Sequence, residues 1–347
     1  MKIKKYFILF LFIFANVFLF AQPFNGLGDG TESNPYQIWT KLDWQEFTDS
    51  VSNALWLNST WYQNKHLRLM DDIGIITEYL NRTSLSPGWY LHCGGKKINV
   101  EIMCNSKNYY RALFFYIGHD TIDSLIIDGI VNQDCGCAAI CDNVGIGTIS
   151  HCINNAKIPF GHAGIASRNG GFIIHCINNS NITGGYEVAG IAGGNSRIIE
   201  NCINNGNITG VTRIGGIAGG NSRIIENCTN KGKITASGGN DSSCVGGIVG
   251  WTGGENIEIS NCINLGNVVG ENKVGGIIGL LREGWFNASS NISITNCINY
   301  GYIKGWNGVG GILGNLHGDS FTDISNCVNT GVVEGDTDVG SIVGKEY

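Results

Sequence analysis

The chain is poor in proline and in charged residues, and these shortages limit the class of protein. It has 4 prolines among 347 residues, and charged residues make up only 14% of it. A composition of this kind argues against a protein with many charged surface helices. The formal net charge is −6 and no basic patch stands out, so nucleic acid is not expected as a partner.

Long apolar runs are also scarce, and the one that stands out lies at the N-terminus. Lys2–Lys5 is basic, Tyr6–Phe20 is apolar, and Ala21 is a small residue at which cleavage is expected. This order predicts a secretory signal peptide over residues 1–21. The run is short for a membrane span, and a retained anchor is the alternative. We therefore expect an extracytoplasmic protein with no integral membrane span after signal removal.

Glycine, in contrast, is abundant, and much of it lies in internal repeats. The chain has 52 glycines, and the stretches Ala189–Gly210 and Gly215–Thr235 are nearly identical. Such self-similarity indicates a repeat architecture. Seven copies align on a cysteine at intervals of 24 to 35 residues, so one unit recurs with insertions in the later copies. The aligned cysteines are Cys152, Cys176, Cys202, Cys228, Cys262, Cys297 and Cys327.

Other positions recur with the cysteine and define the unit. An isoleucine lies three residues before each cysteine, and an isoleucine or valine lies six residues after it. This spacing predicts short apolar strands separated by glycine and asparagine, with no room for a helix. Two residues after each cysteine stands an asparagine, at Asn154, Asn178, Asn204, Asn230, Asn264, Asn299 and Asn329.

Strands this short can bury an apolar side only by stacking. Coiling successive units into a parallel β-helix places like residues over one another, about 4.8 Å apart. The cysteines and asparagines then become structural ladders, in which amides can bond along the column and tolerate left-handed backbone. The crossover rule makes the coil right-handed. We therefore predict an all-β fold, a right-handed parallel β-helix (β-solenoid).

The units resemble the GLUG repeat of bacterial secreted and cell-surface proteins. The resemblance lies in Gly-Gly-Ile-x-Gly followed by Ile-x-Asn-Cys-x-Asn-x-Gly-x-Ile-x-Gly, over residues 138–347. It implies a right-handed β-helix in an adhesin-like protein, secreted or on the cell surface of a bacterium. The repeat also occurs beside a peptidase domain in some IgA-cleaving proteases, but the His-Glu-x-x-His motif of zinc peptidases is absent from this chain.

The segment ahead of the repeats is expected to cover the first rung. We predict a glycine-rich arm and a capping helix over residues 22–60, with Thr40 as the cap and Asp43 in the first turn. An amphipathic helix there would shield the open end of the solenoid. The β-helix itself is predicted over residues 61–347, with degenerate rungs over 61–137. The apolar face of the helix is expected to comprise Leu42, Trp44, Phe47 and Val51.

Thirteen cysteines in an exported chain would ordinarily suggest disulfides. Seven of them at one repeat position indicate a column of buried thiols instead, and Cys141 aligns with small core residues. For the five remaining cysteines, a disulfide is the alternative that stays open. These are Cys93, Cys104, Cys135, Cys137 and Cys244.

The repeat pattern places no group of catalytic side chains close together on one face. His151 and His175 each precede a cysteine where other copies have asparagine, and a zinc or copper site is the alternative. Acids near the C-terminus, among them Glu334 and Asp338, would keep the exposed last rung from pairing with another chain. Calcium binding by these acids is the alternative. We predict no enzyme activity, no cofactor and no metal. A ladder of ion pairs is expected from Arg197 with Glu200 and Arg223 with Glu226.

Exposed aromatic residues are the candidate ligand-binding feature. Strand parity after Cys297 turns Tyr300 and Tyr302 away from the core, and Trp306 follows at a corner. Aligned rings on a flat sheet suit stacking against sugar rings or a protein surface. Three of the four insertions in the later copies enter at one repeat phase and should emerge along one edge of the rod, whereas a fourth, around residues 237–243, enters at a different phase. They carry a second candidate patch, with packing against the rod as its alternative, at Trp251, Trp285 and Phe286.

We therefore expect a non-catalytic, adhesin-like protein that binds a glycan or a host or cell-surface protein. It would act as a monomer or within a surface assembly. One alternative is a carbohydrate-active enzyme, a polysaccharide lyase or glycoside hydrolase, whose cleft would hold at least two acids within about 10 Å. The other is a purely structural surface stalk.

Overall fold

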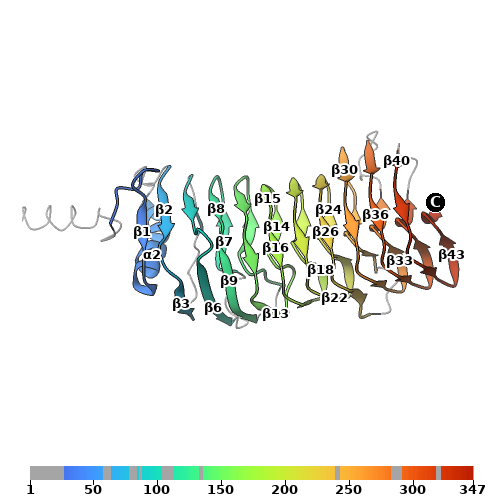
Figure 1. Ribbon diagram of the computed structural model, residues 1–347, viewed down its shortest axis with the longest axis horizontal. Coiled ribbons are helices and arrows are strands. Elements are labelled where there is room, and N and C mark those ends of the chain that lie inside the picture. Colours follow the sequence, from blue (N-terminus) through green and yellow to red (C-terminus); the bar gives the residue numbers. More distant parts are fainter. Residues whose placement is uncertain are drawn as a thin grey trace, which may run out of the picture.

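The computed structural model describes residues 27–57, 64–77, 84–85, 88–103, 112–132, 136–238, 243–282, 291–317 and 322–346. The predicted signal peptide and the start of the arm lie outside these ranges. Within them the chain forms a rod of stacked parallel strands, with a helix at its N-terminal end (Figure 1). The predicted parallel β-helix is confirmed.

Two long sheets extend along the rod, and each strand pairs with the equivalent strand of the next turn. Sheet A consists of β1 (Tyr36–Ile38), β2 (His66–Leu69), β5 (Tyr90–His92), β8 (Thr121–Asp123), β11 (Thr148–Ser150), β15 (Phe172–Ile174), β20 (Ile198–Glu200), β25 (Ile224–Glu226), β30 (Ile257–Ser260), β35 (Ile292–Thr295) and β40 (Thr322–Ser325). Sheet C consists of β4 (Ser84–Leu85), β7 (Phe114–Ile117), β10 (Cys141–Val144), β14 (Ala166–Asn169), β19 (Ala192–Asn195), β24 (Ala218–Asn221), β29 (Val249–Thr252), β34 (Ile278–Arg282), β39 (Leu313–His317) and β44 (Val343–Glu346).

Three further columns of strands complete the later turns. Sheet B consists of β3 (Ile73–Ile76), β6 (Lys97–Met103), β9 (Ile126–Asn132), β12 (Ile153–Asn154), β16 (Ile177–Asn178), β21 (Ile203–Asn204), β26 (Thr229–Asn230), β31 (Ile263–Asn264), β36 (Ile298–Asn299) and β41 (Val328–Asn329). Sheet E branches from β9 and consists of β13 (Lys157–Phe160), β17 (Ile182–Thr183), β22 (Ile208–Gly210), β27 (Ile234–Ala236), β32 (Val268–Val269), β37 (Ile303–Lys304) and β42 (Val333–Glu334). Sheet D consists of β18 (Tyr186–Ala189), β23 (Thr212–Gly215), β28 (Val245–Gly246), β33 (Asn272–Gly275), β38 (Asn307–Gly310) and β43 (Thr337–Gly340).

The register stacks like residues inside the rod. In sheet A, Ile149 pairs with Ile173 and Ile199 pairs with Ile225, and all four side chains are fully buried. The other inward columns join them in one continuous core. Burial stabilises the fold by about 1.5–3 kcal/mol for each such side chain, so the columns can offset the ordering of many short strands.

The asparagines two residues after the cysteines form a hydrogen-bonded ladder inside the rod. The Nδ2 group of Asn178 donates to Oδ1 of Asn204 at 2.8 Å, and the same contact repeats at 2.7 or 2.8 Å from Asn154 to Asn329. The second N–H of Asn204 is donated to the carbonyl oxygen of Gly206 at 2.8 Å. A buried amide that would otherwise destabilise the core is thus bonded to the rung on either side.

The seven repeat cysteines lie in a neighbouring column. Six are fully buried and Cys327, in the last described turn, is half-buried. The thiol of Cys228 donates to the carbonyl oxygen of Glu226 at 3.2 Å, and burial raises the pKa of Cys228 well above its ordinary value. The eleven cysteines of the described residues, among them Cys93, Cys137, Cys141 and Cys244, form no disulfide with one another. Cys104 and Cys135 lie outside the described residues.

The residue before each of these cysteines turns the corner between sheets A and B. Its φ lies between 52° and 55° in all seven copies. Asparagine tolerates this left-handed conformation better than most residues, which explains its recurrence at the corner. Two of these corners are occupied by histidine instead. The column comprises His151, His175, Asn201, Asn227, Asn261, Asn296 and Asn326.

Helix α2 (Lys41–Leu57) begins at the predicted cap. The backbone N–H of Thr40 donates to Asp43 Oδ2 at 2.8 Å, and the N–H of Asp43 donates to Thr40 Oγ1 at 3.2 Å. Trp44 and Phe47 are buried, so the helix covers the first rungs as expected. Leu42, in contrast, is 63% exposed and the prediction for it is wrong, because it lies off the helical face that Trp44 and Phe47 share.

Two further features bear on the predicted boundaries. Strand β1 precedes the helix and pairs with β2, so paired strands start at Tyr36, within the segment predicted as arm and helix. The three insertions of the later copies all lie between a sheet C strand and the following sheet A strand, which are β29 and β30, β34 and β35, and β39 and β40. They therefore enter at one phase of the repeat.

Candidate functional site

The aromatic patch comprises Tyr300, Tyr302 and Trp306. Tyr300 and Tyr302 lie in the turn between β36 and β37, and not within one strand as the sequence pattern suggests. The side chains of Tyr300 and Trp306 are 52% and 55% exposed. Their backbones are held by the adjacent turn, since the N–H groups of Tyr300 and Trp306 donate to Asn264 O at 2.8 Å and Glu271 O at 2.6 Å. Two large rings thus project from well-paired backbone.

Tyr302 differs from these two residues because its hydroxyl group is already bound. It donates to the carboxylate of Glu334 on the next turn, and Lys304 Nζ contacts the other oxygen of Glu334 at 2.5 Å. These two contacts, that of Lys304 first, lower the pKa of Glu334. The predicted terminal acids Glu334 and Asp338 are both paired with lysine, and Asp338 contacts Lys345 at 2.7 Å.

Of the second predicted patch, the structure describes Trp251 alone. Trp251 lies in β29 and is half-buried, with the guanidinium group of Arg213 over its ring at 4.4 Å. Arg213 also lies over the ring of Tyr186 at 4.8 Å and donates to Glu187 at 2.7 Å. Trp251 is therefore engaged in packing against the rod. Trp285 and Phe286 lie outside the described residues.

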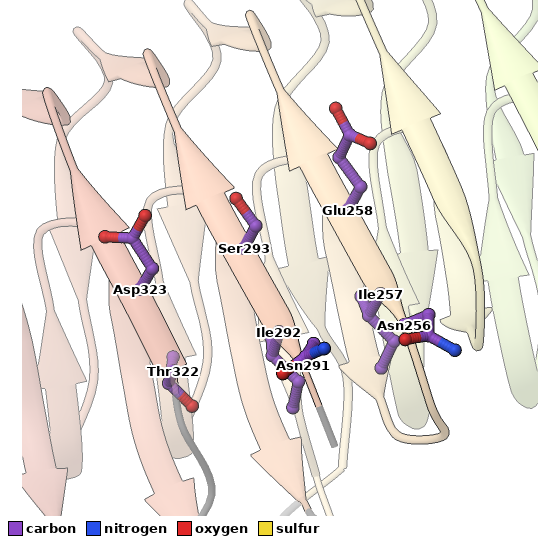
Figure 2. Close-up of a pocket in the computed structure, with 8 residues that line it drawn as sticks. All are labelled: Asn256, Ile257, Glu258, Asn291, Ile292, Ser293, Thr322 and Asp323. Carbon is purple, nitrogen blue, oxygen red and sulfur yellow. The ribbon is translucent and has the colours of Figure 1, made fainter. Parts of the chain in front are cut away.

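A groove on sheet A is a feature that the sequence alone did not identify. It encloses about 430 Å³ across β30, β35 and β40, and Figure 2 shows Glu258, Ser293 and Asp323 in a row on these strands. The register pairs Glu258 with Ser293 and Ser293 with Asp323, so the two acids stand two strands, or about 9.6 Å, apart. The groove adjoins the edge at which the insertions enter. We call it the acidic groove.

A histidine stack lies on the first turns of sheet A and was also missed. The rings of His66 and Tyr90 stack at 4.6 Å, and His66 Nδ1 lies 3.0 Å from His92 Nε2. Burial, together with His66 and Arg68, lowers the pKa of His92. The single-copy rungs 66–69 and 90–92 have no repeat signal, so only pairwise register could have revealed this contact.

Asp123 lies in β8, next to the predicted histidine corner. Burial raises the pKa of Asp123, but hydrogen bonds from Ser150 and His151 lower it by more, so the pKa lies below its ordinary value. His151 Nδ1 lies 2.9 Å from Asp123 Oδ1, and the rings of His151 and His175 stack at 4.9 Å. Among the described residues no group of three or more potential ligands could hold a metal ion.

The predicted ion-pair ladder of arginine and glutamate does not form. The guanidinium group of Arg197 lies over the ring of Phe172 at 4.6 Å, and Arg223 donates to the backbone carbonyl of Glu255 at 3.0 Å. The carboxylate of Glu200 accepts instead from Asn201 at 2.8 Å. The arginines precede their strands, so they reach a different column from the glutamates at the strand ends.

These features define a parallel β-helix whose outer columns carry aromatic, amide and acidic side chains. Residues 210–235 match the GLUG motif, which confirms the resemblance inferred from the repeat units. The motif is typical of extracellular proteins. Within the described residues no helix is long and apolar enough to cross a membrane.

The chain is similar to a protein from Bacteroides ovatus named "putative immunoglobulin A1 protease", with 18% identity, a TM-score of 0.43, and coverage of 92% of this chain and 87% of the other. No curated protein sequence matches this chain.

Proposed function

We propose that this protein is a secreted or surface-exposed, adhesin-like binding module that holds a glycan or a surface protein without chemical change. The observation that carries the proposal is the exposure of Tyr300 and Trp306, 52% and 55%, on a rung whose backbone is paired to the preceding turn. Aromatic rings fixed in this way can stack on sugars at a small cost in conformational entropy. The predicted signal peptide and the GLUG motif support an extracellular setting.

Removal of the two exposed rings should weaken binding about tenfold. Each ring contributes about 0.5–1.5 kcal/mol beyond its buried area, so two rings together account for roughly that factor. Wild type and Tyr300→Ala/Trp306→Ala would be compared on a glycan array and in pull-downs with cell walls and surface proteins.

Two variants serve as controls for this experiment. Tyr302→Phe removes a hydroxyl group that is already bound to Glu334, and Ile146→Ala removes an exposed apolar side chain between β10 and β11, away from the patch. Both should bind as wild type does. Equal binding by the double variant and the wild type would refute the aromatic patch, and a wild type that binds nothing would favour the structural stalk.

The acidic groove favours a second candidate, a carbohydrate-active enzyme. Glycoside hydrolysis with inversion uses two carboxyl groups about 6.5–9.5 Å apart, and the register places Glu258 and Asp323 near the upper end of that range. Each carboxylate accepts a hydrogen bond at 3.2 Å, from Ser260 and Ser325 respectively. These hydroxyl groups fix the direction of the acids across the groove.

An assay of released sugar ends tests the groove. If it is catalytic, wild type should release reducing or unsaturated ends from neutral or acidic polysaccharides, and Glu258→Gln should lower the rate by a factor of about 100. Ser260→Ala removes only an orienting hydroxyl group and should retain most of the rate. Wild-type protein that releases no such ends would eliminate this candidate.

A further inference from the structure

Exposed asparagines continue the face that carries the aromatic patch towards the N-terminus. Asn155, Asn179 and Asn205 stand three residues after successive repeat cysteines, in the column that later holds Tyr300. All three side chains are exposed. Asn179 Nδ2 donates to Asn155 Oδ1 at 2.8 Å, and Asn205 Nδ2 donates to Asn179 Oδ1 at 2.7 Å. We call these three residues the outer amide track.

The contacts within the track leave hydrogen-bonding groups directed at solvent. An asparagine side chain has two N–H donors and an oxygen with two lone pairs. The ladder uses one donor of each amide, so a second donor of each remains available on every turn. Because neighbouring amides hold one another, the free donors and acceptors are fixed in position and repeat with the rungs, about 4.8 Å apart.

A parallel column supplies a second row of amides. Asn181 and Asn207 lie two residues further along and are exposed as well. Their oxygens accept backbone N–H groups of the next turn, from Asn207 at 2.8 Å and from Lys233 at 2.9 Å. Within the described part of the chain their Nδ2 groups donate to no other residue. Further along, the two columns hold exposed Lys231 and Lys233 and then pass Tyr300 and Tyr302.

We propose, resting on the binding function above, that the ligand is a linear polysaccharide that lies along the rod, from the outer amide track to Tyr300. Five rung spacings separate Asn155 from Tyr300, a span of about 24 Å. A 1,4-linked pyranose chain advances by a similar distance per sugar, so successive hydroxyl groups meet successive amides. The fixed amides complement the hydroxyl groups of such a chain, and exposed Lys231 adds a donor on the same column between Asn205 and Tyr300.

Titration calorimetry with 1,4-linked mannan oligosaccharides of two, four and six sugars tests this placement on the full chain. Affinity should rise at least tenfold from two to six sugars. Asn179→Ala/Asn205→Ala should reduce the affinity for six sugars to nearly that for two, and Tyr300→Ala should weaken all lengths. Ser196→Ala, an exposed substitution on the same turns but away from the track, should change neither. Thermal unfolding of each variant would verify that it is folded.

The outcomes separate this inference from the proposed function. If binding depends on Tyr300 but is independent of length and of the double asparagine variant, the axial placement is wrong and the aromatic patch stands. If wild type binds no glycan of any length, both the inference and the glycan form of the proposed function fail.

Discussion

Replacing Asn204 with alanine should lower the free energy of unfolding by about 3 kcal/mol or more, whereas Asn205→Ala should change it by less than about 0.5 kcal/mol. The two residues are adjacent in sequence and both are bonded to asparagines of the preceding turn. Asn204 is fully buried and Asn205 is exposed. The pair therefore separates the effect of burial from the effect of residue type.

The large effect of Asn204→Ala follows from the groups that it leaves unbonded. The side chain accepts from Asn178 and donates to Asn230 and to the carbonyl oxygen of Gly206, each at 2.8 Å. Each of these partners is buried, and a buried polar group without a partner costs about 1–3 kcal/mol. Three such groups together give the expected loss. At Asn205 the partner is exposed, so water replaces the lost contact.

Urea unfolding followed by circular dichroism would measure both variants against wild type. The slope of the transition should be unchanged if the same surface is exposed on unfolding. Equal losses at the two positions would contradict the stacking of asparagines inside the rod, because the register is what places one amide in the core and the next in solvent. A small effect at Asn204 would have the same meaning.

Repetition explains which parts of the structure the sequence could predict. The columns of Ile199, Cys202 and Asn204 recur in every copy, and stacking of like on like leaves little freedom in where they lie. The capping helix was recognisable for a different reason, because Thr40 and Asp43 form a local motif that requires no knowledge of the fold. Both kinds of element could be predicted, because one recurs in every repeat and the other is a motif of a few adjacent residues.

Residues that occur once were harder to place. Glu258 and Asp323 lie on either side of Ser293 in register, and the same position is threonine, phenylalanine or isoleucine in the other copies. Parity arguments placed Tyr300 correctly outside the core but assumed a continuous strand where the chain makes a turn. Trp251 was assigned to a loop, yet the cation–π contact with Arg213 holds it against the rod. Contacts between unlike residues on neighbouring turns leave no periodic signal.

Gly216→Ala should destabilise the protein by about 3 kcal/mol or more, through a clash and without backbone strain. A Cβ atom at Gly216 would lie 2.2 Å from the carbonyl oxygen of Gly247 and 2.4 Å from Cγ of Asn230, and neither group can move without disrupting the ladder. The same position is glycine in six successive turns, from Gly164 to Gly311, with Ala139 in the turn before them and Ser341, which is exposed, in the last described turn.

Gly185→Ala is the matched control, because no atom lies within 4 Å of a Cβ atom built there. Its φ is not in the left-handed region, so alanine should be neutral or should stabilise by up to about 1 kcal/mol by restricting the unfolded chain. Thermal unfolding of both variants checks the contrast. A Gly216→Ala protein as stable as Gly185→Ala would mean that the asparagine ladder has room to shift. The close stacking of turns, on which both the outer amide track and the aromatic patch depend, would then be incorrect.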